Sequence, residues 1–359
     1  MDDGQFDVLT RALTMSSRRR AFQSITGVAV GLAGFAQPTW AKTKKKSTLC
    51  FNGQTVKASS KKKKKLIKQG ATPGACGGPA TCAANAECGT GAICVAGVCQ
   101  PCAVTCDGNG NACGSALNAR LAKGGTVYIC PGRYIGFFTS NAVTMVGAGM
   151  GEDPATNTIL DGSDSGRTLS ISDGATVSLS RLRITRGNAG SSPGGGIFAK
   201  GGDLTIDNCA IEKNRADSGG GIHVKDGRLT MRNTSVAENT GTISGGGIQL
   251  LTGFASTIAS SRITGNRSPS TSWGMGGGLR VYENTLTITD TEISGNSAMN
   301  EGGGIYVYNS TLKLNSGTRV ASNSVSPGRT GGGIYSFNAD LQLGGATIIG
   351  NTPDNIYED

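Results

Sequence analysis

The sequence Gly-Gly-Gly-Ile at residues 194–197 is the first of six copies of one short phrase, and these copies decide the fold. The phrase returns at residues 219–222, 245–248, 276–279, 302–305 and 331–334, with leucine replacing isoleucine in the fourth copy. The aliphatic positions lie 25, 26, 31, 26 and 29 residues apart. A period of this length is typical of a solenoid, in which each repeat stacks on the next.

Each repeat ends with an aliphatic residue three positions before an asparagine. These pairs are Ile211/Asn214, Val236/Asn239, Ile263/Asn266, Ile293/Asn296, Val320/Asn323 and Ile348/Asn351. Between the two phrases apolar and polar residues alternate, as in Leu229-Thr230-Met231-Arg232, which predicts short half-buried strands. Two or three strands per repeat would close one coil of a parallel β-helix. We expect the glycines at corners that need positive φ or close approach, and the asparagines in a turn ladder.

These paired phrases resemble the repeats of polymorphic outer-membrane proteins and of pectin-lyase-like right-handed parallel β-helices. The stretches Thr126–Tyr134, Val143–Gly149 and Thr158–Gly162 are similar to the opening coils of that family. The resemblance covers Cys113–Asp359 and implies an all-β, single-stranded right-handed parallel β-helix over residues 113–359. In this family a short helix often covers the first coil, and Gly114–Lys123 has a helical pattern. The fold hosts lyases, hydrolases, adhesins and tailspike proteins, so it selects no function.

Residues 1–41 are predicted to be an export signal. The run Arg18-Arg19-Arg20 precedes an apolar stretch, Ile25–Ala36, and Thr39-Trp40-Ala41 fits a small-x-Ala cleavage pattern. An arginine pair followed by x-Phe resembles the twin-arginine signal of prokaryotes, although the pair Arg19-Arg20 lacks the usual preceding Ser or Thr. A general secretory signal and an uncleaved anchor are the alternatives. We therefore expect an extracellular or cell-surface protein without a transmembrane span in the mature chain.

Residues 42–75 form a lysine-rich arm. Residues 1–72 carry 15 Lys and Arg against three Asp, whereas residues 73–359 carry 19 basic and 21 acidic residues, so the net charge of +10 comes from the N-terminal part. We expect a solvated linker, and the functional alternative is adhesion to an anionic surface of wall polymer, lipid head groups or acidic polysaccharide. Nucleic-acid binding is not expected, because aromatic residues are almost absent from the arm and the protein is exported.

Ten of the eleven cysteines lie close together in the N-terminal part of the chain. They are Cys50, Cys76, Cys82, Cys88, Cys94, Cys99, Cys102, Cys106, Cys113 and Cys130. Dense cysteines with few apolar residues predict disulfides in an oxidising compartment, with a disulfide module at residues 76–112. We expect pairs Cys50–Cys76 and Cys113–Cys130, and a knot among the six cysteines between them. A zinc site at Cys99-x-x-Cys102 is the weaker alternative. Cys209 is expected to be a buried thiol.

The repeats carry no catalytic arrangement that we can identify. If the residue after each glycine phrase points outwards, no two carboxylates fall on neighbouring coils of one face, whereas glycoside hydrolysis ordinarily needs two carboxyl groups. Asp161–Gly166 has oxygen ligands for calcium but not the spacing of a known calcium loop, so we expect a turn and no cofactor or metal. His223, the only histidine, is expected at the surface rather than as a general base.

The same pattern places aromatic residues and an arginine on one outer face of the last three coils. They are Arg280, Tyr282, Tyr306, Tyr308, Tyr335 and Phe337. A flat strip of exposed rings would bind the faces of sugars, and Trp273 lies just before this group. The alternative is a ladder of residues that have a high strand propensity.

Together these features predict an exported, non-catalytic, adhesin-like β-helix protein that binds a glycan or another extracellular partner, such as an envelope polymer. A polysaccharide lyase or glycoside hydrolase with the same fold is the alternative. A purely structural spacer is a third possibility.

Overall fold

The computed structural model describes residues 47–51, 54–73 and 81–359, and these residues fall into two compact units that divide at residue 77. The first unit contains an antiparallel sheet of β1 (Ser47–Phe51), β2 (Gln54–Ala58) and β3 (Thr72–Pro73), together with helix α1 (Ser60–Lys68). The lysine-rich arm at residues 42–75 was expected to be a solvated linker. Its lysine block, Lys61–Lys65, instead lies in helix α1, because Leu66 packs against Leu49 and Ala58.

The second unit begins with a small disulfide module. It contains the 3-10 turn η1 (Asn85–Glu87) and a hairpin of β4 (Ala92–Val95) and β5 (Val98–Pro101), followed by helix α2 (Gly110–Leu121). Helix α2 packs against the opening strands of the solenoid and buries Leu117 and Leu121, which confirms the predicted helix and moves its start to Gly110. No helix in the described residues is long and apolar enough to span a membrane.

The disulfide pairing differs from the prediction. The bonds within residues 81–359 are Cys82–Cys94, Cys88–Cys99, Cys102–Cys130 and Cys106–Cys113. The predicted Cys113–Cys130 bond is wrong, because Cys106 lies seven residues before Cys113 and bonds to it across the start of α2. The six cysteines from Cys82 to Cys106 therefore do not pair only with one another. Cys102 bonds to Cys130 and Cys106 bonds to Cys113. The predicted Cys50–Cys76 bond involves a residue outside the described ranges. Cys209 is free and buried, as expected.

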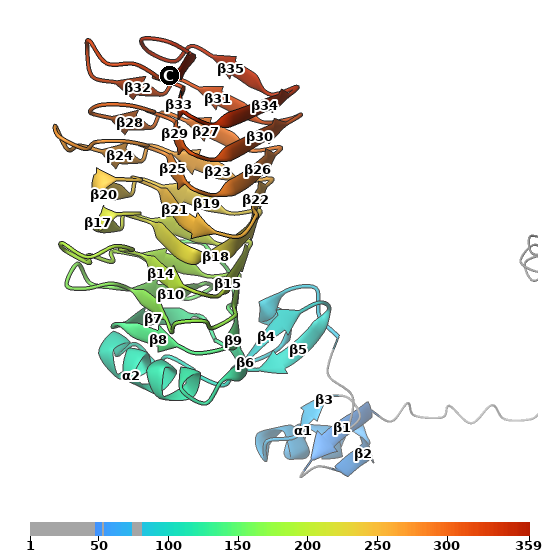
Figure 1. Ribbon diagram of the computed structural model, residues 1–359. Helices are drawn as coiled ribbons and strands as arrows, with labels where there is room; N and C mark the ends of the chain where they lie inside the picture. Colours follow the sequence, from blue (N-terminus) through green and yellow to red (C-terminus); the bar gives the residue numbers. More distant parts are fainter. Residues whose placement is uncertain (1–46, 52–53, 74–80) are drawn as a thin grey trace, which may run out of the picture. The chain divides into compact units, whose positions relative to one another are not determined.

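Three faces of parallel strands wind round the solenoid, and Figure 1 shows them stacked coil upon coil. Face 1 comprises β8 (Phe138–Ser140), β11 (Leu169–Ile171), β14 (Ile197–Lys200), the first half of β18 (Ile222–Arg232), β21 (Ile248–Gly253), β25 (Leu279–Tyr282), β29 (Ile305–Tyr308), β33 (Ile334–Phe337) and β36 (Ile356–Glu358). Face 2 comprises β6 (Gly125–Tyr128), β9 (Val143–Val146), β12 (Val177–Ser180), β15 (Asp203–Asp207), the second half of β18, β22 (Ser256–Ala259), β26 (Thr285–Thr289), β30 (Thr311–Asn315) and β34 (Asp340–Gly344).

Face 3 and a set of short corner strands complete each coil. Face 3 comprises β7 (Gly132–Ile135), β10 (Thr158–Asp161), β13 (Arg183–Thr185), β16 (Ala210–Glu212), β19 (Ser235–Ala237), β23 (Arg262–Thr264), β27 (Glu292–Ser294), β31 (Arg319–Ala321) and β35 (Thr347–Ile349). The corner strands are β17 (Arg215–Ser218), β20 (Thr240–Ser244), β24 (Arg267–Ser268), β28 (Ser297–Ala298) and β32 (Ser324–Val325), and they lie between face 3 and face 1. The repeats therefore form a parallel β-helix.

The repeat pattern of the sequence becomes a stack of identical positions in space. The aliphatic residue of each glycine phrase pairs with its counterpart in the next coil, from Ile197 to Ile334, and all six are fully buried. Alternate residues point into the solenoid, and neighbouring parallel strands lie about 4.8 Å apart. One continuous apolar core follows, running from Val104 to Ile334.

The asparagines form the predicted ladder inside the corner after face 3. Each of Asn214, Asn239, Asn266, Asn296 and Asn323 donates its backbone N–H and its side-chain Nδ2 to the Oδ1 of the asparagine in the next coil, at 2.9–3.0 Å. The same Nδ2 donates to a backbone carbonyl one coil back, as Asn266 does to Val236 O at 2.9 Å. The ladder therefore satisfies buried backbone groups that no strand can satisfy at a corner.

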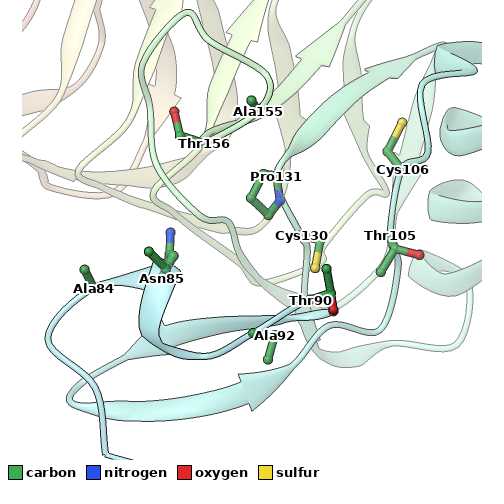
Figure 2. A pocket seen from close by; sticks show the side chains of 13 residues that line it. Ala84, Asn85, Thr90, Ala92, Thr105, Cys106, Cys130, Pro131, Ala155 and Thr156 are labelled. Atoms are coloured by element: carbon green, nitrogen blue, oxygen red, sulfur yellow. The ribbon is translucent and has the colours of Figure 1, made fainter. Parts of the chain in front are cut away.

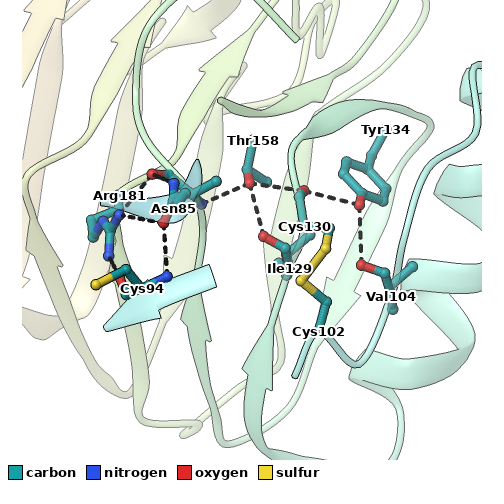
Figure 3. Close-up of a disulfide and its surroundings, with 10 residues drawn as sticks. Asn85, Cys94, Cys102, Val104, Ile129, Cys130, Tyr134, Thr158 and Arg181 are labelled. Carbon is teal, nitrogen blue, oxygen red and sulfur yellow. Dashed lines mark hydrogen bonds between the residues drawn. A yellow bond between two sulfur atoms is a disulfide. The ribbon is translucent and has the colours of Figure 1, made fainter. Parts of the chain in front are cut away.

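Arg181 ties the disulfide module to the β-helix, as Figure 3 shows. Its guanidinium donates to Cys94 O and Ala148 O, the latter at 2.8 Å, and to Asn85 Oδ1 at 3.3 Å. The Asn85 amide in turn donates to Ala148 O at 2.8 Å. Together with the Cys102–Cys130 bond, these contacts hold the module against the first coils.

Candidate functional site

The six residues of the predicted aromatic face come together in two columns on the outside of face 1. Arg280, Tyr306 and Tyr335 stand opposite one another on successive strands β25, β29 and β33. Two positions further along the same strands, Tyr282, Tyr308 and Phe337 form the second column. We call these the inner and the outer column, because the inner one lies beside the corner strands.

The rings form ladders, which was the alternative to the predicted flat platform. Ring centroids are 4.8–5.3 Å apart within both columns, and neighbouring ring planes are only 2–4° apart. Each ring therefore covers the face of its neighbour and turns an edge to the outside. Tyr306 and Tyr335 are moreover only 7% exposed, because they pack with Met275. The expectation that all five rings are exposed is wrong for these two.

The inner column continues towards the N-terminus with one further aromatic residue and two polar ones. Phe198, His223 and Gln249 precede Arg280 on β14, β18 and β21. His223 was expected at the surface, but it is only 4% exposed and stacks on the Phe198 ring with centroids 5.5 Å apart. Burial, followed by the charge of Arg167 and of Lys225, lowers the pKa of His223 to about 4. The imidazole is therefore neutral at physiological pH.

Acid should destabilise the fold through this histidine. Its pKa is about 6.5 in the unfolded chain and is lowered in the fold, so the contribution of the neutral ring is complete above about pH 6.5 and is lost as the pH falls towards 4. Between about pH 7 and 4.5 we expect a loss of about 2 to 3 kcal/mol from this group. Urea unfolding at both pH values measures it. The variant His223→Gln carries the residue that the next coil has at Gln249, and it should lose correspondingly less. An equal loss in both proteins would contradict the assignment.

Three polar atoms near the inner column are buried and make no hydrogen bond. They are His223 Nδ1, Arg280 Nε and Asp217 Oδ1, and within the described residues Asn284 Oδ1 is the one further atom of this kind. Burial raises the pKa of Asp217 and lowers that of Arg280. The Arg280 guanidinium also lies over the rings of Tyr282 and Tyr306, at 5.2 and 5.9 Å from their centroids. A buried polar atom without a partner costs about 1 to 3 kcal/mol, so such atoms favour a ligand that supplies the partner.

Trp273 offers the exposed ring face that the ladders lack. It is 64% exposed, the highest value among the large apolar side chains of the described residues, and stacks on no other ring there. The loop that carries it is held by bonds from Trp273 N to Ser270 Oγ at 3.1 Å and from Gly274 N to Ser270 O at 2.9 Å. Two residues later, Met275 packs against the inner column. Trp273 lies just before the predicted aromatic face in the sequence and was not one of its six residues.

Asp161, the first residue of the possible calcium loop, takes part in an ion-pair network. Asp161, at the end of β10, is fully buried and accepts hydrogen bonds from Arg186, Arg133 and the backbone N–H of Ser163. Burial alone would raise the pKa of Asp161, but these donors outweigh it and the pKa is lowered. Both carboxylate oxygens are taken by protein donors, so Asp161 serves the structure here.

A separate cleft lies between the disulfide module and the first coils, and Figure 2 shows it from close by. Its volume is about 960 Å³, and Ala84 and Asn85 lie on one side, with Ala155 and Thr156 on the other. No charged side chain lines it. Its hydroxyl groups and small apolar side chains offer no group for acid–base or nucleophilic chemistry, so we assign it no reaction.

Comparisons with known proteins identify the family to which the fold belongs. A search of curated proteins found no match. Among solved structures, the A-module of mannuronan C-5 epimerase AlgE4 from Azotobacter vinelandii is 15% identical, with 69% of this chain and 96% of that chain covered and a TM-score of 0.23. Likeness at this level supports no statement about activity. The family model described as "Right handed beta helix region" matches residues 167–353, more than half of the chain. The protein therefore belongs to the right-handed β-helix family.

Proposed function

We propose that this protein is an exported, non-catalytic β-helix protein that binds an extracellular glycan on the outside of face 1. The lysine-rich segment would hold it at an anionic surface. Four disulfides support export, since such bonds persist in oxidising compartments. The observation that carries the proposal is the group of buried, unpartnered polar atoms at His223, Arg280 and Asp217.

These atoms suit the hydroxyl groups of a sugar. Arg280 Nε is a donor and Asp217 Oδ1 an acceptor, while a hydroxyl both donates and accepts and so can satisfy either. The neutral His223 ring adds a further nitrogen at physiological pH. The strands of face 1 place equivalent positions about 4.8 Å apart, so the columns present a repeating surface to an extended polymer.

Aromatic contact would come from Trp273 and from the edges of the outer column. A free indole face packs against the apolar face of a pyranose, whereas the stacked rings of Tyr282 and Tyr308 present edges and hydroxyl groups. Different variants test the two kinds of contact. Trp273→Ala removes a face, and Tyr282→Phe with Tyr308→Phe removes two hydroxyl groups and leaves the stack in place.

The test is retention of a panel of soluble polysaccharides by the purified protein, with and without calcium, together with measurement of new chain ends. We expect retention without new ends, about ten-fold weaker binding in Trp273→Ala, and a smaller loss in the double Phe variant. Phe254→Ala is the matched control, since Phe254 is 60% exposed and lies away from this face at the start of face 2. Replacing Tyr306 would be uninformative, because its ring is buried and its loss would change stability.

Other outcomes decide against the proposal. New chain ends would mean a lyase or hydrolase and would direct attention to Asp217 and His223. If retention is unchanged in Trp273→Ala and in the double Phe variant, the glycan binds somewhere other than face 1. No retention of any polysaccharide would favour a spacer or a protein partner.

A further inference from the structure

Helix α1 carries a run of lysines whose orientation is fixed by one buried residue. Leu66 is 8% exposed and packs into the small core of Leu49, Ala58 and Ala71. With about 100° between successive helical residues, this contact turns the opposite side of the helix outwards. Lys61, Lys64, Lys65 and Lys68 lie on that side and are exposed, and Lys62 is exposed as well.

The described residues of the first unit hold no carboxylate that could neutralise these lysines. The sequence has no Asp or Glu between Asp7 and Glu87, so no carboxylate exists in residues 8–86 to pair with them. Five exposed ammonium groups within nine helical residues repel one another. Such an arrangement costs stability unless an anionic partner is present, which indicates a binding surface.

An exposed aliphatic residue lies among the lysines of α1. Ile67 is 44% exposed and lies one helical turn from Lys63 and Lys64, about 100° round the helix from Leu66. A soluble polyanion has no apolar region to receive this side chain. The interface of a lipid bilayer has both phosphate groups and acyl chains, and basic amphipathic helices bind there through lysines and aliphatic residues together.

We propose that α1 binds the surface of an anionic lipid bilayer, with its lysines at the phosphate groups and Ile67 entering the boundary of the acyl chains. This deepens the anionic-surface contact of the proposed function and names its partner, and it is independent of glycan binding on face 1. The first unit thereby anchors the protein reversibly, and high salt should release it.

The test is partition of the full chain onto vesicles of equal parts phosphatidylcholine and phosphatidylglycerol, with pure phosphatidylcholine vesicles and soluble heparin as parallel arms. We expect Lys61→Gln, Lys64→Gln, Lys65→Gln and Lys68→Gln combined to weaken binding to the anionic vesicles roughly a hundred-fold or more. Ile67→Ser should weaken it about five-fold and leave heparin binding unchanged. Ile243→Ser is the matched control, since Ile243 is 42% exposed in the β-helix, and it should change neither.

Ile67→Ser that behaves like Ile243→Ser on anionic vesicles would overturn the proposal, and heparin binding that depends on the lysines would then identify a soluble polyanion as the partner. Equal partition of wild type and the four-lysine variant would remove α1 from the interaction. Polysaccharide retention, measured on the same variants, tests glycan binding on face 1 separately from lipid binding by α1. Retention of uncharged polysaccharides should be unchanged in all of them.

Discussion

Replacing Asn266 with alanine should lower the free energy of unfolding by about 3 to 5 kcal/mol. The Asn266 side chain donates to Val236 O and to Asn296 Oδ1, and its own Oδ1 accepts from the backbone N–H and the Nδ2 of Asn239. Alanine leaves the Val236 carbonyl and the Asn239 N–H buried without partners, and each such group costs about 1 to 3 kcal/mol. The loss of the amide also leaves a gap inside the corner.

Denaturant unfolding followed by far-ultraviolet circular dichroism measures this change, and hydrogen exchange locates it. Exchange should become faster in the coils around Val236 and Asn296 before it does so near the ends, because each coil contacts only its neighbours. Asn141→Ala is the control, since Asn141 is exposed and its side chain accepts one hydrogen bond, from Ser172. A stability loss no larger than that of Asn141→Ala would show that the ladder does not stabilise the solenoid.

The repeat part of the fold was predictable because each coil makes the same contacts. A glycine phrase recurring every 25 to 31 residues, with an aliphatic residue that must be buried, leaves few arrangements other than stacked coils. The inward direction of Ile197 and Ile334 and the asparagine ladder follow from that periodicity, and the structure confirms both. The pattern also led to the correct columns for Tyr306 and Tyr308.

What the pattern could not provide is the environment outside the coil. Sequence alternation separates inward from outward residues, but it does not show that corner strands and Met275 cover the inner column. His223 and Tyr335 therefore seemed exposed although they are buried. The disulfide pairing failed for a related reason, since spacing alone allows many connectivities. In the lysine block, a single leucine was too weak a signal to predict that α1 packs on a sheet.

The second glycine of each phrase is a position at which neighbouring coils approach closely. A Cβ added to Gly246 would lie 2.3 Å from Gly277 O, 2.5 Å from Arg267 O and 2.6 Å from Arg267 N. All three are backbone atoms of hydrogen-bonded neighbouring segments, so they have little freedom to move away. The preceding residue, Gly245, is glycine for a different reason, because its φ is positive at 58°.

Gly246→Ala should therefore destabilise the protein by about 3 kcal/mol or more, because a methyl group can be accepted only if two coils separate. The matched control is Gly344→Ala in β34, where the nearest atom to an added Cβ is Leu314 O at 3.4 Å and φ is not positive. That substitution should change stability by about 0.5 kcal/mol at most. Denaturant midpoints of the two variants compare the same chemical change in a closed and an open position. Equal midpoints would mean that the solenoid can expand at its corners, and the repeated glycines would then need another explanation.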